Sequence, residues 1–165
     1  SLRKNELNSN YGNGILTADE ISRYNYHNVE LVVLSSCLGG MNDIVASRGF
    51  QGLIGGLSAT GVKYVISNIW NADDFATAIL MDAFYYQYCV KKTAPPVALK
   101  RAKQYLRRVT IGDLKRRNWF EYILHDNILN AKIKKRISSY VEKNERFRPF
   151  KNEVYWSGFT CFRCN

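Results

Sequence analysis

The chain has 165 residues, of which 46% are hydrophobic, and it carries a formal net charge of +10. This size fits one ordinary domain with a hydrophobic core. No run approaches the roughly 18 apolar residues of a membrane span, and no secretory signal opens the chain. The four cysteines lack the regular spacing of a disulfide framework. We therefore expect a cytoplasmic protein with reduced thiols.

The first expected elements are a loop and a short helix. Residues 1–14 are polar and rich in asparagine, which predicts a loop. Thr17 and Glu20 have the spacing of a capping box, in which each side chain accepts a hydrogen bond from the other residue's backbone N–H, so a helix is expected to begin there. Because the chain begins with Ser1 rather than methionine, we expect it to be a piece of a longer protein.

The next stretch, LVVLSSCLGG from Leu31 to Gly40, is the centre of the chain. Its first four residues are aliphatic without polar alternation, which predicts a buried strand of a parallel sheet. Cys37 follows where the strand ends, and chemistry gathers at the carboxyl ends of strands in open α/β sheets, so Cys37 is a candidate nucleophile. Gly39 and Gly40 would let the backbone approach an oxyanion or a bound peptide. The alternative is a structural cysteine at the end of a core strand.

Neither histidine of the chain is well placed to act as the base of this thiol. His27 precedes Cys37 by ten residues, and an extended strand of that length would separate the two by more than about 20 Å. His125 and Asp126 lie in a later helical segment with no obvious route to this end of the sheet, and adjacent residues of a helix do not face each other.

A βαβ unit is expected to follow the cysteine. Residues 41–48 predict a polar loop, and residues 50–60 predict a helix whose glycines would let it lie close to the sheet. Residues 62–70, VKYVISNIW, predict a second strand, parallel to the first. The end of this strand, from Asn68 to Asp74, should therefore come near Cys37.

Asp73 and Asp74 begin a helix that is expected to run to about Val90. Carboxylates are favourable at the positive end of a helix, so capping is one role for both. The other is that one carboxylate pairs with a basic side chain of a substrate. Cys89, in the same helix, is expected to take part in packing.

The second half of the chain is basic. A helix is expected over residues 97–109 after two prolines, and residues 110–149 are helical in pattern. Residues 91–151 hold 18 Lys and Arg against 5 Asp and Glu, whereas the remainder holds 6 against 9. Such a region could bind nucleic acid, an acidic protein or lipid headgroups. The commoner case is that the basic residues form solvated helix faces. No zinc finger, Walker loop or RNP pattern supports the nucleic-acid alternative.

The chain ends with an aromatic segment, residues 154–164, that predicts a last strand. Cys161 and Cys164 form half of a zinc motif without its second half, and they lack the strand-to-helix setting of a redox pair. The sequence therefore implies no metal and no organic cofactor.

The order of these segments resembles a known family. GILTADEI, LVVLSSCLGG, GLIGGLSATGVKYVISNIWNADD, AILMDAFYYQ, PVALKRAKQYL and YWSGF are together similar to a CHAT domain, a caspase-like cysteine peptidase domain related to separase. The resemblance covers Gly14 to Phe159 and implies an α/β, caspase-like fold with a mainly parallel sheet flanked by helices. It also implies one partial CHAT domain over residues 1–165, with residues 110–150 as a basic helical insertion.

The resemblance further implies a Cys-His dyad with Cys37 as the nucleophile. Asn68, Trp70, Asp73 and Asp74 would approach the pocket for the residue before the scissile bond, where an acid favours Lys or Arg. The family's catalytic histidine is followed by glycine and precedes the nucleophile, but no His-Gly pair occurs in this chain. We therefore expect the histidine upstream in the same protein and this chain to be inactive alone. A non-catalytic scaffold that binds a partner, or nucleic acid, is the alternative.

Overall fold

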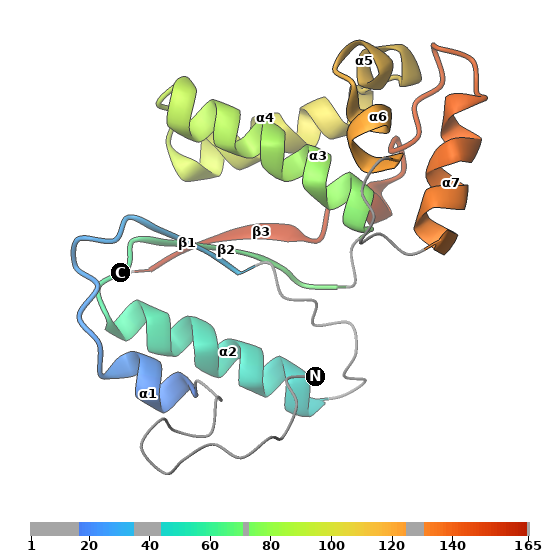
Figure 1. The fold of residues 1–165 in the computed structure, drawn as a ribbon. Helices are drawn as coiled ribbons and strands as arrows, with labels where there is room; N and C mark the ends of the chain where they lie inside the picture. Colours follow the sequence, from blue (N-terminus) through green and yellow to red (C-terminus); the bar gives the residue numbers. More distant parts are fainter. Residues whose placement is uncertain (1–16, 35–43, 71–72, 125–130, 165) are drawn as a thin grey trace, which may run out of the picture. The chain divides into compact units, whose positions relative to one another are not determined.

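The computed structural model describes residues 17–34, 44–70, 73–124 and 131–164 (Figure 1). Cys37, Gly39 and Gly40 lie outside these ranges, as do the opening loop, His125 and Asp126. The chain divides into two compact units. Residues 1–67 and 162–165 form the first, here called the N-terminal unit, and residues 68–161 form the second, here called the helical unit. Across the described ranges, no helix is both long enough and apolar enough to cross a membrane.

Three strands form a mixed sheet. Strands β1 (Leu31–Leu34), β2 (Tyr64–Asn68) and β3 (Phe159–Arg163) lie in the order β1-β2-β3. β1 and β2 are parallel, with Leu34 opposite Ser67, as the βαβ pattern predicted. The aliphatic side chains of β2 after its first residue are fully buried. These strands, together with the helices, are compatible with the expected α/β class.

The pairing of β3 with β2 does not follow the mainly parallel sheet that was expected. Cys164 N donates to Lys63 O at 2.9 Å and Ile69 N donates to Gly158 O at 3.0 Å, so residue numbers fall along β3 as they rise along β2. This pairing is therefore antiparallel. The expected strand over residues 154–164 was too long, because Glu153–Tyr155 form a 3₁₀ helix, η3, whose start is capped by the Asn152 side chain.

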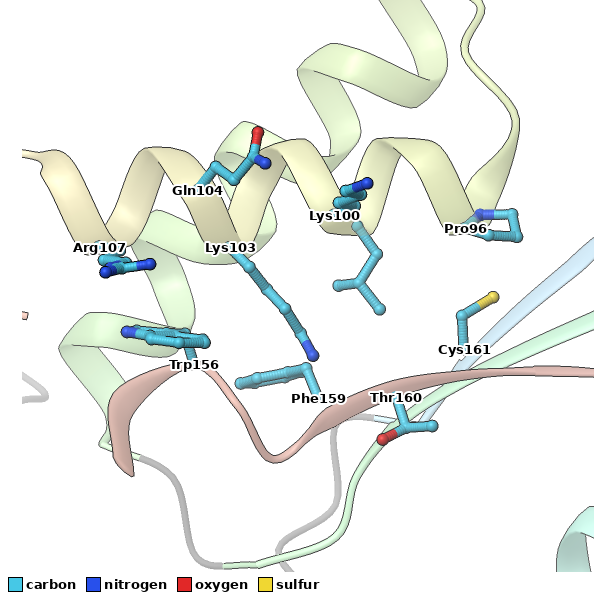
Figure 2. Close-up of a pocket in the computed structure, with 10 residues that line it drawn as sticks. Pro96, Lys100, Lys103, Gln104, Arg107, Trp156, Phe159, Thr160 and Cys161 are labelled. Carbon is cyan, nitrogen blue, oxygen red and sulfur yellow. The ribbon is translucent and has the colours of Figure 1, made fainter. Parts of the chain in front are cut away.

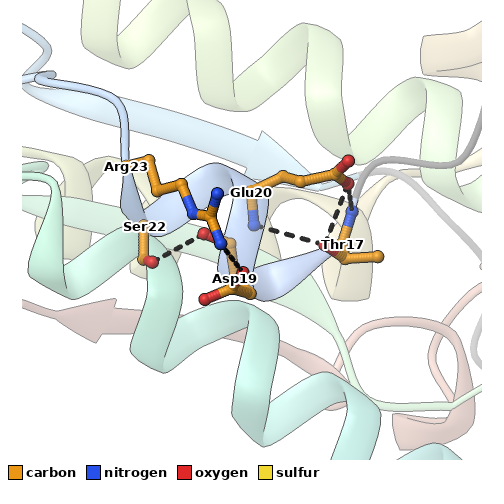
Figure 3. A network of polar contacts seen from close by, with 5 residues as sticks. All are labelled: Thr17, Asp19, Glu20, Ser22 and Arg23. Atoms are coloured by element: carbon orange, nitrogen blue, oxygen red, sulfur yellow. Dashed lines mark hydrogen bonds and ion pairs between the residues drawn. The ribbon is translucent and has the colours of Figure 1, made fainter. Parts of the chain in front are cut away.

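The capping box predicted at Thr17 is confirmed. Helix α1 (Ala18–Ser22) begins directly after it. Glu20 N donates to Thr17 Oγ1 at 3.2 Å, and Thr17 N donates to Glu20 Oε2 at 2.7 Å (Figure 3). These bonds satisfy backbone donors that the helix start would otherwise leave unpaired.

Helix α2 (Ile44–Ala59) is longer than the sequence predicted, because it begins within the stretch expected to be a polar loop. Its glycines were expected to approach the sheet, and this was wrong. A Cβ at Gly56 would lie 2.7 Å from Ala18 O, so Gly56 allows α2 to pack against the backbone of α1. Buried Ile21, Leu57, Val62 and Val65 form the core of the N-terminal unit with Cys164.

We expect Gly56→Ala to lower the free energy of unfolding by about 1–3 kcal/mol, because the new methyl group would force α1 and α2 apart. Gly55→Ala is the matched control, since a Cβ at Gly55 meets nothing within 4 Å and alanine favours a helix by up to about 1 kcal/mol. Urea unfolding of both variants checks this. Equal effects of the two substitutions would contradict the close approach at Gly56.

The helical unit contains the remaining helices. In chain order they are α3 (Asp74–Tyr85), a π-helix η2 (Tyr86–Val90), α4 (Pro95–Arg108), α5 (Ile111–Arg116), α6 (Trp119–Leu124) and α7 (Ala131–Val141). α4 begins earlier than expected because its two prolines occupy the first helical positions, where a missing N–H costs nothing. Its apolar stripe, Ala98, Ala102 and Leu106, is fully buried.

Residues 110–150 are integrated into the core of the helical unit. Ile111, Leu114 and Ile137 are fully buried. The Phe75 ring at the start of α3 lies 6.0 Å from the ring of Phe120 in α6. The segment that the sequence marked as basic therefore also supplies apolar side chains that hold the unit together.

Candidate active site

The edge of the sheet where β1 and β2 end is the place at which the sequence predicted a site. Leu34, the last residue of β1, lies opposite Ser67, and Asn68 follows Ser67 directly. Ser67 Oγ and Asn68 Oδ1 are buried and have no hydrogen-bond partner within the described ranges. An unsatisfied buried polar atom costs about 1–3 kcal/mol, and such atoms often mark a functional site or a missing partner. Cys37, three residues beyond Leu34, is outside the described residues.

Asn68 and Trp70 are held by the segment that leads into β3. Asn68 Nδ2 donates to Trp70 O, and Trp70 Nε1 donates to Val154 O at 3.1 Å. A Cβ at Gly158 would collide with the indole of Trp70, so this position must remain glycine. The sequence did not single out Val154 or Gly158, because their contact with Trp70 depends on the antiparallel pairing of β3.

Asp73 is committed to contacts within the helical unit. Its Oδ1 accepts a hydrogen bond from Ala76 N at 2.9 Å and so caps α3. Its Oδ2 lies 2.6 Å from Arg136 Nη1 of α7, and its side chain is only 9% exposed. Burial, aided by the neighbouring Tyr155, raises the pKa of Tyr140, beside this ion pair, to about 12. The helix-capping role expected for at least one of the two acids is therefore present at Asp73.

We expect Arg136→Met to lower the free energy of unfolding by about 1–3 kcal/mol, because it leaves the nearly buried Asp73 carboxylate without its cation. Lys135→Met is the matched control, since the neighbouring Lys135 is exposed and should change the free energy by less than about 0.5 kcal/mol. Urea unfolding of both variants checks this. A loss of the same size in Lys135→Met would show that the effect comes from α7 itself and not from the ion pair.

Asp74 differs from its neighbour. It is the first residue of α3 and is exposed, and its side chain makes no hydrogen bond or ion pair with the residues that the structure describes. Of the two acids, Asp74 is thus the more exposed.

His27 lies at the other end of the strands. It precedes β1, and its ring packs against Gly61, which precedes β2 and has a φ of +92°. The two residues therefore sit at the amino ends of the parallel pair, away from the edge after Leu34 and Ser67. Because Cys37 lies outside the described residues, the expectation that His27 is a poor base for it stays a prediction.

The described cysteines are Cys89, Cys161 and Cys164, and they do not form a metal site together. Cys89 is exposed, so its expected packing role was wrong. Cys164 belongs to the core of the N-terminal unit, whereas Cys161 lines a pocket of the helical unit. None of the three is in a disulfide, and the described residues include no cluster of metal-ligating side chains.

The comparisons with known proteins gave one match. A family model described as the CHAT domain matches residues 3–163, which is nearly the whole chain. No curated protein and no solved structure matches the chain.

Proposed function

Because this chain belongs to the CHAT domain family, which is linked to caspase-like cysteine peptidases, we propose that it carries the nucleophile of a cysteine endopeptidase. The observation that carries the proposal is the parallel register that sets Leu34 opposite Ser67. Cys37 follows Leu34 by three residues, and three residues span at most about 11 Å. We therefore propose that the thiol acts at the end of β1, at the edge of the sheet where Leu34 and Ser67 lie.

The proposed chemistry is covalent catalysis by Cys37. A histidine from the upstream part of the same protein takes the thiol proton, and the thiolate attacks the peptide carbonyl. Backbone N–H groups around Gly39 and Gly40 stabilise the oxyanion, and the histidine then protonates the leaving amine. Water hydrolyses the resulting thioester and restores the thiol.

The proposed substrate is a protein or peptide with Lys or Arg before the scissile bond. Support comes from Asp74, which is exposed and unpaired among the described residues, whereas Asp73 is paired with Arg136. Trp70, 36% exposed next to Asn68, would supply an aromatic wall for the aliphatic part of such a side chain. We propose Asn68, Trp70, Asp73 and Asp74 as the substrate-binding set, with Asp74 as the main acceptor of the cation.

Labelling with a peptidyl chloromethyl ketone directed to Lys or Arg tests this proposal. The reagent should label Cys37 in a longer form of the protein that includes the upstream His-Gly segment, and it should label this chain alone far more slowly. Asp74→Asn in the longer form should reduce labelling, while a leucine-directed reagent should be unaffected by the substitution. If Cys37 is not labelled in either form, the proposal of a peptidase is wrong.

A second candidate is a non-catalytic scaffold that binds a partner through its basic helices. It is favoured by the two histidines of the chain, neither of which is followed by glycine. An upstream sequence without a His-Gly after an apolar strand would favour this candidate.

A further inference from the structure

A second cavity lies in the helical unit, and none of the residues proposed for catalysis or substrate binding lines it. Helix α4 and the segment from Trp156 to Cys161 line an open cavity of about 440 Å³ (Figure 2). Small-molecule sites have volumes of about 300–1,000 Å³, so the cavity can hold a ligand of nucleotide size.

Three cations line this cavity from one side. Lys100, Lys103 and Arg107 occupy positions i, i+3 and i+7 of α4, which place them on one helix face over about 10 Å. No Asp or Glu is among the described residues that line the cavity. The wall therefore offers three positive charges without an acid to balance them.

Lys103 points into the cavity between α4 and Phe159 (Figure 2). Its Nζ donates to Ser157 O at 3.3 Å, which is a neutral partner. Burial lowers the pKa of Lys103, because the partly desolvated ammonium loses hydration that no carboxylate replaces. Lys103 is therefore a partly buried cation with no acidic side chain among the residues that line the cavity.

The opposite wall is aromatic and apolar. Trp156 and Phe159 line it, and Phe159 is almost fully buried. Leu99 adds an apolar side chain on the α4 side. The Arg107 guanidinium lies 5.9 Å from the centroid of the Trp156 ring, which holds this cation at one end of the cavity. Trp156 Nε1 is buried without a hydrogen-bond partner in the described part of the chain, so a donor without an acceptor lies at that end as well.

We infer that this cavity binds a small phosphate-bearing polyanion of nucleotide size, whose phosphate groups contact Lys100, Lys103 and Arg107 and whose apolar part lies against Phe159. Two lysines and an arginine along a helix suit several phosphate oxygens better than a single carboxylate. The volume of about 440 Å³ lies within the range of small-molecule sites, which favours a small polyanion. The inference goes beyond the proposed peptidase and does not depend on it.

Calorimetric titration of the chain with tripolyphosphate and with ATP tests this inference. We expect saturable binding with one site, and a dissociation constant that rises about tenfold or more in Lys103→Met and in Arg107→Gln. Arg108→Gln is the matched control, because Arg108 is next to Arg107 on α4, carries the same charge and does not line the cavity. It should change the constant less than twofold. Lys103→Met should unfold at the same or a higher urea concentration, since it removes a desolvated charge.

Three results would overturn the inference. One is the absence of saturable binding of either probe at low salt. Another is an equal loss of affinity in Arg107→Gln and Arg108→Gln, which would indicate adsorption to the net positive charge. The third is a short DNA duplex or an acidic peptide that binds through Lys103 and Arg107 when tripolyphosphate does not. None of these measurements reads peptidase activity, so a failure here is distinguishable from a failure of the proposed function.

Discussion

Cys37→Ala should lower the rate of peptide cleavage by about 10³-fold or more, measured in the longer form of the protein with a reporter peptide that ends in Arg before its leaving group. The expected loss is large because no other group can form the acyl-enzyme, so the thiol is required in every turnover. The KM for the reporter should change little, since the Cys37 side chain contributes the attacking sulfur and not the binding of the Arg side chain.

Cys89→Ala is the matched control for this experiment, because Cys89 is an exposed cysteine of the helical unit and should leave the rate unchanged. Cleavage that survives in Cys37→Ala would exclude Cys37 as the nucleophile. Turnover by the present chain alone, lost in Cys37→Ala, would instead show that the catalytic base lies within these residues and not upstream.

Phe150→Ala should lower the free energy of unfolding by about 3–5 kcal/mol, as measured by urea denaturation. Phe150 is fully buried, and its ring lies 5.6 Å from Phe75 and 5.3 Å from Tyr155. A further ring, that of Tyr140, lies 6.0 Å away. Alanine would leave a cavity at the point where α3, α7 and η3 meet. A typical domain has a free energy of unfolding of about 5–15 kcal/mol, so the substitution would remove a large part of it.

Phe147→Ala is the matched control, because the Phe147 side chain is 41% exposed and three residues away. Its loss should cost less than about 1 kcal/mol. If both variants lost the same free energy, or if Phe150→Ala cost less than the control, the aromatic cluster would not be the core of the helical unit.

The basic charge of the second half has several distinct roles in the structure. Arg136 neutralises Asp73, and Arg117 lies 3.3 Å from Asp82 of α3. Arg116 pairs with Asp113, whose pKa is held below its usual range by hydrogen bonds from Thr110 at the start of α5. The solvated helix faces that the composition favoured therefore account for only part of this charge.

Local signals in the sequence determined the start of α1, the approximate start of α4 and the central strands. The capping box of Thr17 and the two prolines in the first turn of α4 act within one turn, so they can be identified without a fold. The apolar runs of β1 and β2 and their short crossover predicted a parallel pair, which the register of Leu34 with Ser67 confirms. The CHAT resemblance is likewise confirmed, because it depends on the order of such segments along the chain.

Contacts between residues far apart in sequence were decided only by the tertiary structure. Neither the antiparallel pairing of β3, the commitment of Asp73 to Arg136, nor the approach of Gly56 to Ala18 leaves a periodic pattern in the sequence. The cavity beside Lys103 belongs to the same class, since its walls are separated by about 50 residues of chain. Local patterns specify which elements form, whereas the pairing of distant side chains depends on how those elements pack, and packing is a property of the whole chain.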